Sequence, residues 1–241
     1  MKIDDLEIEQ VNHARYLGVI FDDKLNFEEQ FNRIKSKLKD GVKALMCTRL
    51  TLNFKAKLLL YNGSIKSHIE YCSVAFFDKF NKTQINELYR LQKQAVRLIF
   101  NARKNVHSEK LFKLAGILPL TKMYEYEAIK MIYKFKQEPL SDTQPLAIRE
   151  LIIPQNHESI RLYQEQNKIK IPNSYKYGHS LYNMIRLWNN SNPDARIAGN
   201  IWSLKKLLKN DFIQSLPTCH TKDCNICKLD EDKDYQKYMT A

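Results

Sequence analysis

The stretch NFEEQFNRIKSKLKDGVKAL, residues 26–45, decides the fold of this chain. Its apolar side chains recur at steps of three and four residues, which places them on one stripe of an amphipathic helix. They are Phe27, Phe31, Ile34, Leu38, Val42 and Leu45. Asn26 is the predicted N-cap of this helix, with Glu29 three residues later as its reciprocal partner. The basic side chains fall outside the apolar stripe; they are Arg33, Lys35, Lys37, Lys39 and Lys43.

Six further segments carry helical patterns, so the chain is predicted to be mainly α. They are residues 53–71, 81–100, 108–115, 121–138, 180–188 and 203–214. Asn81 and Gln84 form a predicted capping box at the start of the second segment. Gly116 is the expected C-cap of the third. Trp188 and Trp202 are spaced as helix-core or anchoring residues.

A short β segment is predicted at the N-terminus. Residues 3–11 alternate loosely, and residues 16–21 form an apolar run rich in β-formers that ends in the turn residues 22–24. Residues 139–180 hold four prolines, which indicates a mixed or irregular region with small strands, including a hairpin around 160–162 and 168–171. The predicted fold is therefore a short β segment, a helical bundle, and a mixed region with two more helices.

Charge is concentrated in one part of the chain. The 241 residues carry a formal net charge of +12, with 44% hydrophobic and 27% charged residues, which is a globular composition. Residues 28–115 hold 18 Lys and Arg against 7 Asp and Glu, a net charge of +11. A basic field of this density favours a polyanionic partner, with nucleic acid as the leading candidate. The alternative interpretation is a lysine-rich surface that only meets solvent.

The sequence favours an intracellular location. No apolar run is long enough to span a bilayer, so no membrane partner is expected, and residues 1–10 lack the apolar core of a secretion signal. Five Cys is an odd number, which argues against a disulfide framework and fits a reducing compartment. We therefore expect the protein in the nucleus and cytoplasm.

A cluster of thiols near the C-terminus forms a candidate zinc site. Cys219, His220, Cys224 and Cys227 are the candidate ligands. Three thiolates suit tetrahedral Zn²⁺, but a fourth ligand is needed, and His220 directly follows Cys219 in the chain. Free surface thiols and a redox Cys-x-x-Cys motif are the alternatives, and the sequence does not choose among the three.

Five short motifs follow one another along the chain. The first is Arg-Tyr-Leu-Gly-Val at residues 15–19, followed by an Asp and Leu turn and a basic helix. The helix motif Leu-Gln-Lys-Gln-Ala-Val-Arg-Leu-Ile occupies residues 91–99, and the others lie within residues 60–72, 107–120 and 171–209. In this order they resemble the end of the reverse transcriptase domain of non-LTR (LINE-type) retrotransposons. The sequence departs from that family at Cys72, where Gly is frequent.

The resemblance implies a division of the chain into four parts. Residues 1–27 would be the last strands of the polymerase palm, and residues 28–138 a basic, thumb-like helical bundle. Residues 139–215 would be the segment after the thumb, and residues 216–241 a Cys-containing acidic tail. The family's metal-binding aspartates would precede Met1, so Mg²⁺ would belong to the parent polymerase alone. We therefore expect the isolated chain to be inactive in RNA-directed DNA synthesis.

The same resemblance implies that this region grips the template–primer. Its partners would be RNA, DNA or an RNA–DNA hybrid, together with the upstream polymerase segment of the parent protein. The candidate phosphate contacts are Lys35, Lys39, Lys43, Arg90, Lys93, Arg97, Arg103 and Lys104. Asp22 and Asp23 are similar to the family's paired metal-binding aspartates, but their position predicts a polar turn. The alternative function is a host-retained helical domain that binds a protein partner, with an incidental basic surface.

Overall fold

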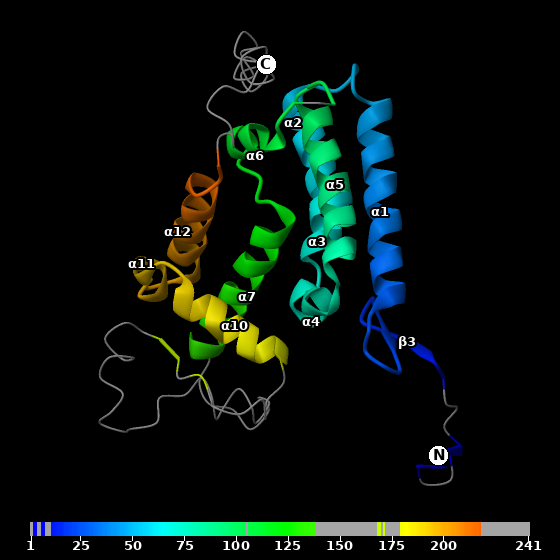
Figure 1. Ribbon diagram of the computed structural model, residues 1–241, viewed down its shortest axis with the longest axis vertical. Helices are drawn as coiled ribbons and strands as arrows, with labels where there is room; N and C mark the ends of the chain where they lie inside the picture. Colours follow the sequence, from blue (N-terminus) through cyan, green and yellow to red (C-terminus); the bar gives the residue numbers. More distant parts are fainter. Residues whose placement is uncertain are drawn as a thin grey trace. The chain divides into compact units, whose positions relative to one another are not determined.

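The computed structural model describes residues 2–3, 6–7, 11–104, 106–137, 168–169, 171 and 179–217. It is mainly helical, with a short antiparallel hairpin near the N-terminus, which confirms the predicted fold class (Figure 1). The chain divides between Lys104 and Asn105 into two compact units, called unit 1 and unit 2 below. The hairpin predicted around residues 160–162 lies outside the described residues, as does the tail from residue 218.

The N-terminal hairpin corrects one prediction. Strands β1 (Lys2–Ile3) and β2 (Leu6–Glu7) form one short pair, and β3 (His13–Tyr16) and β4 (Val19–Asp22) form another. Leu17 and Gly18 join β3 to β4 with φ values of 45° and 82°. Two successive left-handed residues are what a tight two-residue hairpin turn requires. The interpretation of residues 16–21 as one continuous strand is therefore wrong.

Helix α1 (Glu28–Cys47) begins differently from the prediction. Its N-cap is Phe27, in a left-handed conformation and without a side-chain cap. The carboxylate of Asp22 instead holds the backbone just before the helix: it accepts hydrogen bonds from the backbone N–H groups of Asn26 at 2.9 Å and Phe27 at 2.6 Å. A third bond comes from the N–H of Lys24 at 3.1 Å. The Asn26 cap is thus wrong, because Phe27 takes the N-cap position and Asn26 is held before the helix by Asp22.

The rest of unit 1 is helical, and one predicted cap is confirmed in it. Helix α2 (Phe54–Tyr61) continues through the π-helical turn η1 (Asn62–Lys66) into α3 (Ser67–Glu70). Helix α4 (Ser73–Phe76) and the 3-10 turn η2 (Phe77–Lys79) lead to α5 (Lys82–Ile99). The capping box of Asn81 and Gln84 has both of its hydrogen bonds at 2.9 Å.

The core of unit 1 is formed by three helical rods, which are α1, α5 and the continuous α2–η1–α3 segment. The rings of Phe31 and Phe80 lie 5.5 Å apart near the starts of α1 and α5, so these two helices run in the same direction. The rings of Phe54 and Phe100 lie 5.1 Å apart, which brings the start of α2 to the end of α5. The α2–η1–α3 rod therefore runs against both. All six residues of the predicted α1 stripe are buried.

Gly41 marks the closest approach of α1 to the α2–η1–α3 rod. A Cβ atom at Gly41 would lie 2.6 Å from Cγ1 of Ile65 and 3.0 Å from the carbonyl oxygen of Ser64. Gly63 lies in the same π-helical turn as these neighbours, yet nothing lies within 4 Å of the position of its Cβ. The two glycines thus belong to helices that pack against each other, but an added Cβ atom would clash at Gly41 and would meet nothing at Gly63.

Substitution of these glycines tests the packing directly. Gly41→Ala should lower the free energy of unfolding by roughly 1–2 kcal/mol, because the clash outweighs a gain in helix propensity of about 1 kcal/mol. Gly63→Ala is the matched control and should raise it by up to about 1 kcal/mol. Urea unfolding followed by circular dichroism measures both. Equal effects of the two substitutions would contradict the close approach at Gly41.

Unit 2 packs around a buried tryptophan. It contains α6 (Ser108–Ala115), α7 (Leu120–Gln137), α10 (His179–Asn190), α11 (Pro193–Arg196) and α12 (Ile201–Gln214). Trp188 is fully buried, as predicted, and Gly116 caps α6 at φ 61°. Trp202 does not take a core position, because its side chain is 74% exposed, which leaves the alternative of an anchoring residue.

Among the described residues, no helix is long and apolar enough to cross a membrane.

Candidate nucleic-acid interface

Helices α1 and α5 pack side by side and bring some of the predicted contact residues together. Lys35 on α1 forms an ion pair with Glu87 on α5, with Nζ and Oε2 2.5 Å apart. The hydrogen bond from Lys35 lowers the pKa of Glu87, and the charges of Lys35, Arg90 and Lys39 lower it further. One carboxylate therefore lies within the field of three cations from two helices. We call Lys35, Lys39, Lys43 and Arg90 the basic seam.

The members of the basic seam differ in their exposure and in whether they form an ion pair. Lys39, Lys43 and Arg90 are exposed, and none of them forms an ion pair with a carboxylate in the described part of the chain. Lys35 is half-buried and held by Glu87. Glu87 thus fixes one lysine across the two helices, and three cations remain free to meet a partner.

The other four predicted contact residues lie farther along the chain. Lys93 is half-buried, and its Nζ lies 4.5 Å from the centroid of the Tyr89 ring. Arg97 is also half-buried, two turns after Arg90 on α5. Arg103 and Lys104 are exposed in the segment that follows α5.

Two cations of unit 1 have a structural task instead. Lys57 is only 2% exposed, and its Nζ donates to Oδ1 of Asn101 at 3.0 Å. Arg49 donates to the carbonyl oxygen of Asn101 at 3.1 Å. Burial lowers the pKa of Lys57, and the charge of Arg49 lowers it further. These side chains hold the left-handed Asn101 at the end of α5, so they do not belong to the seam.

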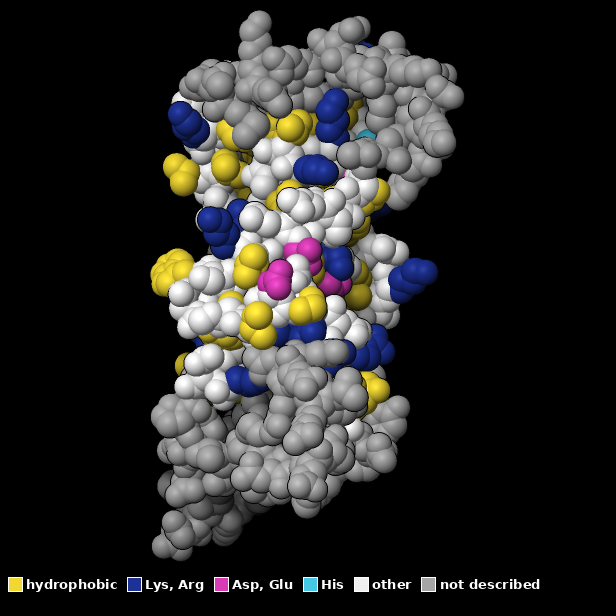
Figure 2. Space-filling view, turned by 90° about the vertical axis from the view of Figure 1, so that its left-hand side faces the viewer, with side chains coloured by type: hydrophobic (Ala, Val, Ile, Leu, Met, Phe, Trp, Pro, Cys, Tyr) yellow, Lys and Arg dark blue, Asp and Glu magenta, His cyan; other side chains and the backbone are white. Residues whose placement is uncertain are grey.

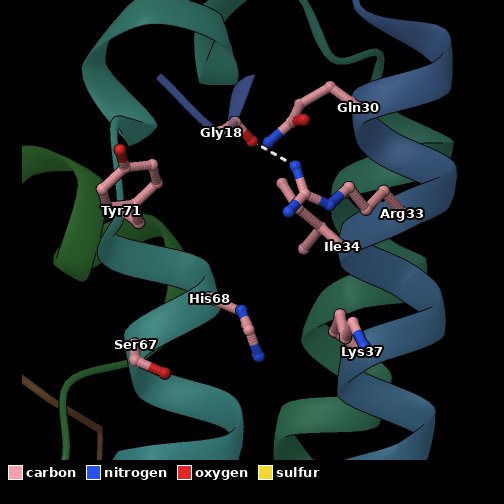
Figure 3. Close-up of a pocket in the computed structure, with 8 residues that line it drawn as sticks. All are labelled: Gly18, Gln30, Arg33, Ile34, Lys37, Ser67, His68 and Tyr71. Carbon is pink, nitrogen blue, oxygen red and sulfur yellow. Dashed lines mark hydrogen bonds between the residues drawn. The ribbon is translucent and has the colours of Figure 1, made fainter. Parts of the chain in front are cut away.

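The opposite flank of α1 carries a pocket that the sequence analysis missed. Its volume is about 360 Å³, and it lies between the turn of the β3–β4 hairpin, α1 and α3 (Figure 3). The polar side chains that line it are Gln30, Arg33, Lys37, Ser67, His68 and Tyr71. The spacing of Arg33 and Lys37 by four residues was visible in the sequence. Their meeting with His68 depends on the antiparallel packing of α3.

The space-filling view shows blue Lys and Arg side chains spread over the described surface, with only a small magenta group of acidic side chains on that face (Figure 2). Among the charged side chains visible on that face, the basic ones predominate. This distribution agrees with the excess of Lys and Arg in the sequence.

The candidate metal-binding residues fall into two classes. The Asp22 carboxylate is engaged by three backbone N–H groups, as a turn residue is. Within the described residues, no group of three or more His, Cys, Asp or Glu side chains could hold a metal ion. The zinc candidates Cys219, His220, Cys224 and Cys227 lie outside those residues, so their zinc site stays a prediction.

No protein-family model, no curated protein and no solved structure matches the chain. The resemblance to non-LTR reverse transcriptases therefore stays a prediction that rests on the five motifs.

The hydrogen bonds of Asp22 make a pH-dependent contribution to stability. They lower its pKa below the usual value of a carboxyl group, with the bond from Asn26 as the largest cause. A lowered native pKa means that the contribution is fully present above about pH 4 and is lost as the pH falls through the native pKa. Asp22→Asn should therefore be less stable than the wild type at pH 7, and the difference should shrink toward pH 2.

Asp23→Asn is the matched control for this prediction. The Asp23 carboxylate accepts no hydrogen bond from the described residues, so its loss should leave the unfolding midpoint unchanged at either pH. Thermal unfolding at several pH values measures both variants. A pH-independent difference between Asp22→Asn and the wild type would contradict the role assigned to this carboxylate.

Proposed function

We propose that this chain binds nucleic acid duplexes through the basic seam. In this proposal it is the template–primer-gripping, carboxy-terminal part of a non-LTR retrotransposon reverse transcriptase. The parent protein would perform RNA-directed DNA synthesis with Mg²⁺ held by its upstream palm segment. The observation that carries the proposal is the meeting of Lys35, Lys39 and Arg90 around the carboxylate of Glu87, with the exposed Lys43 one turn beyond Lys39 on α1.

The geometry of the seam suits a phosphate backbone. Lys35, Lys39 and Lys43 follow one another at steps of four residues, so they extend over about 12 Å of helix. Duplex DNA presents about one negative charge per 1.7 Å of its axis, or roughly seven charges over that length. Lysine side chains that reach outward from a rigid helix can neutralise several of these phosphates and release their counterions.

The seam supports binding without sequence preference. Its members are cations, and cation contacts to phosphate position a protein on the duplex but do not distinguish bases. No described residue is assigned a role in bond making, and the expected inactivity of the isolated chain follows from the resemblance. The zinc site at Cys219, His220, Cys224 and Cys227 and the nuclear and cytoplasmic location belong to the same proposal.

Salt dependence tests the proposal. The triple variant Lys39→Gln, Lys43→Gln, Arg90→Gln should bind an RNA–DNA hybrid more weakly at 50 mM salt than the wild type does. Loss of three phosphate contacts should also reduce the slope of log affinity against log salt concentration by roughly 2 to 3 units. Helix content should not change, because all three side chains are exposed. Fluorescence anisotropy over a salt series measures both quantities.

The matched control removes the same charge elsewhere in unit 1. Lys24, Lys55 and Lys79 are exposed and lie outside α1 and α5, so their joint replacement by Gln should change the slope by less than about 1 unit. Equal slopes for the seam variant, the control and the wild type would contradict the proposal. The protein-interaction domain with an incidental basic surface would then be the better account.

A further inference from the structure

The pocket beside α3 is half-open, and cationic side chains of unit 1 stand at its lining. Arg33 and Lys37 lie one turn apart on α1, and His68 lies opposite them on α3. The guanidinium of Arg33 and the imidazole of His68 point into the space between the two helices (Figure 3). The lining contains no Asp and no Glu. Glu70, the acidic side chain of α3, is held by Lys66 with Nζ and Oε2 2.7 Å apart.

The cations of the pocket have no carboxylate partner among the described residues. Burial lowers the pKa of His68, and the charges of Lys37 and Arg33 lower it further. Neither Arg33 nor Lys37 forms an ion pair with a carboxylate that the structure describes. A positive field that already disfavours protonation of a neighbouring imidazole favours an anion in the same space.

The hydrogen-bond donors of the pocket can be separated into engaged and available groups. The hydroxyl of Ser67 donates to the carbonyl oxygen of Gly63, and the hydroxyl of Tyr71 donates to the carbonyl oxygen of Leu17. Arg33 donates through one nitrogen to the carbonyl oxygen of Gly18, which leaves further N–H groups of its guanidinium. The ammonium of Lys37 is available as well.

A buried amide adds an independent observation. Gln30 is only 4% exposed and lines the same pocket. Its Oε1 accepts a hydrogen bond from the N–H of Ile20 at 3.1 Å. Its Nε2 group has no acceptor among the residues that the structure describes, and the atom is not fully buried. It is therefore available as a further donor to an oxyanion in the pocket.

We propose that this pocket binds a phosphate group, held by Arg33, Lys37 and Gln30 with His68 at its edge. A volume of about 360 Å³ is at the small end for ligand pockets, which fits a phosphate with its waters or a single phosphorylated residue. Arginine and lysine together give charge-assisted hydrogen bonds to phosphate oxygens. The inference is independent of the basic seam, which lies on the other flank of α1.

Titration with inorganic phosphate, followed by two-dimensional NMR of the full chain, tests the pocket. The wild type should show saturable shifts that include the His68 ring and the Gln30 side-chain amide. Lys37→Gln should weaken the affinity about tenfold, the cost of one charge-assisted hydrogen bond. Lys55→Gln removes the same charge from an exposed position on α2 and should bind as the wild type does.

Two further arms identify the source of the phosphate. A short oligonucleotide with a 5′-phosphate should outcompete the same oligonucleotide without it if the ligand is a nucleic-acid end. Equal competition by both, with retained binding of inorganic phosphate, would indicate a free phosphate compound. Absence of saturable shifts in the wild type, or equal affinities of Lys37→Gln and Lys55→Gln, would overturn the proposal. The seam variant should bind inorganic phosphate normally, so failure of one proposal is distinguishable from failure of the other.

Discussion

The apolar stripe of α1 packs at once against α5 and against the α2–η1–α3 rod, and this double burial constrains the rest of unit 1. A helix buried along one stripe by two neighbours has only its two flanks and its outer face left for polar side chains. The absence of a side chain at Gly41 lets the rod approach closely on one side. The ion pair of Lys35 and Glu87 connects α1 to α5 on the other side.

This arrangement distributes the cations of α1 over two flanks. Lys35 and Lys39 lie with Arg90 around Glu87 on the α5 side, where the proposed seam is open to a long polyanion. Arg33 and Lys37 fall on the α3 side, where the rod and the hairpin turn close a pocket around them. The same helix therefore offers an extended surface on one flank and a half-open pocket on the other, and the difference arises from what packs on each flank.

Features of the fold that depend on residues close together in the sequence could be predicted, whereas features that depend on residues far apart in the sequence could not. The α1 stripe and the capping box of Asn81 and Gln84 are visible because their partners lie three or four residues apart. The turn at Leu17 and Gly18 was missed because the apolar residues on both sides of it read as one strand. The pocket of Arg33 and His68 could not be predicted, because only the antiparallel packing of α3 brings residues 35 positions apart together.

The central claim is that a nucleic-acid duplex lies along the seam between α1 and α5. Lysine footprinting tests it most directly: the protein is acetylated with and without an RNA–DNA hybrid, and each lysine is quantified by mass spectrometry. The account predicts strong protection of Lys39 and Lys43 in the complex, with Lys55 and Lys79 as reactive as in the free protein. Equal reactivity of Lys39 and Lys43 with and without bound hybrid would contradict it.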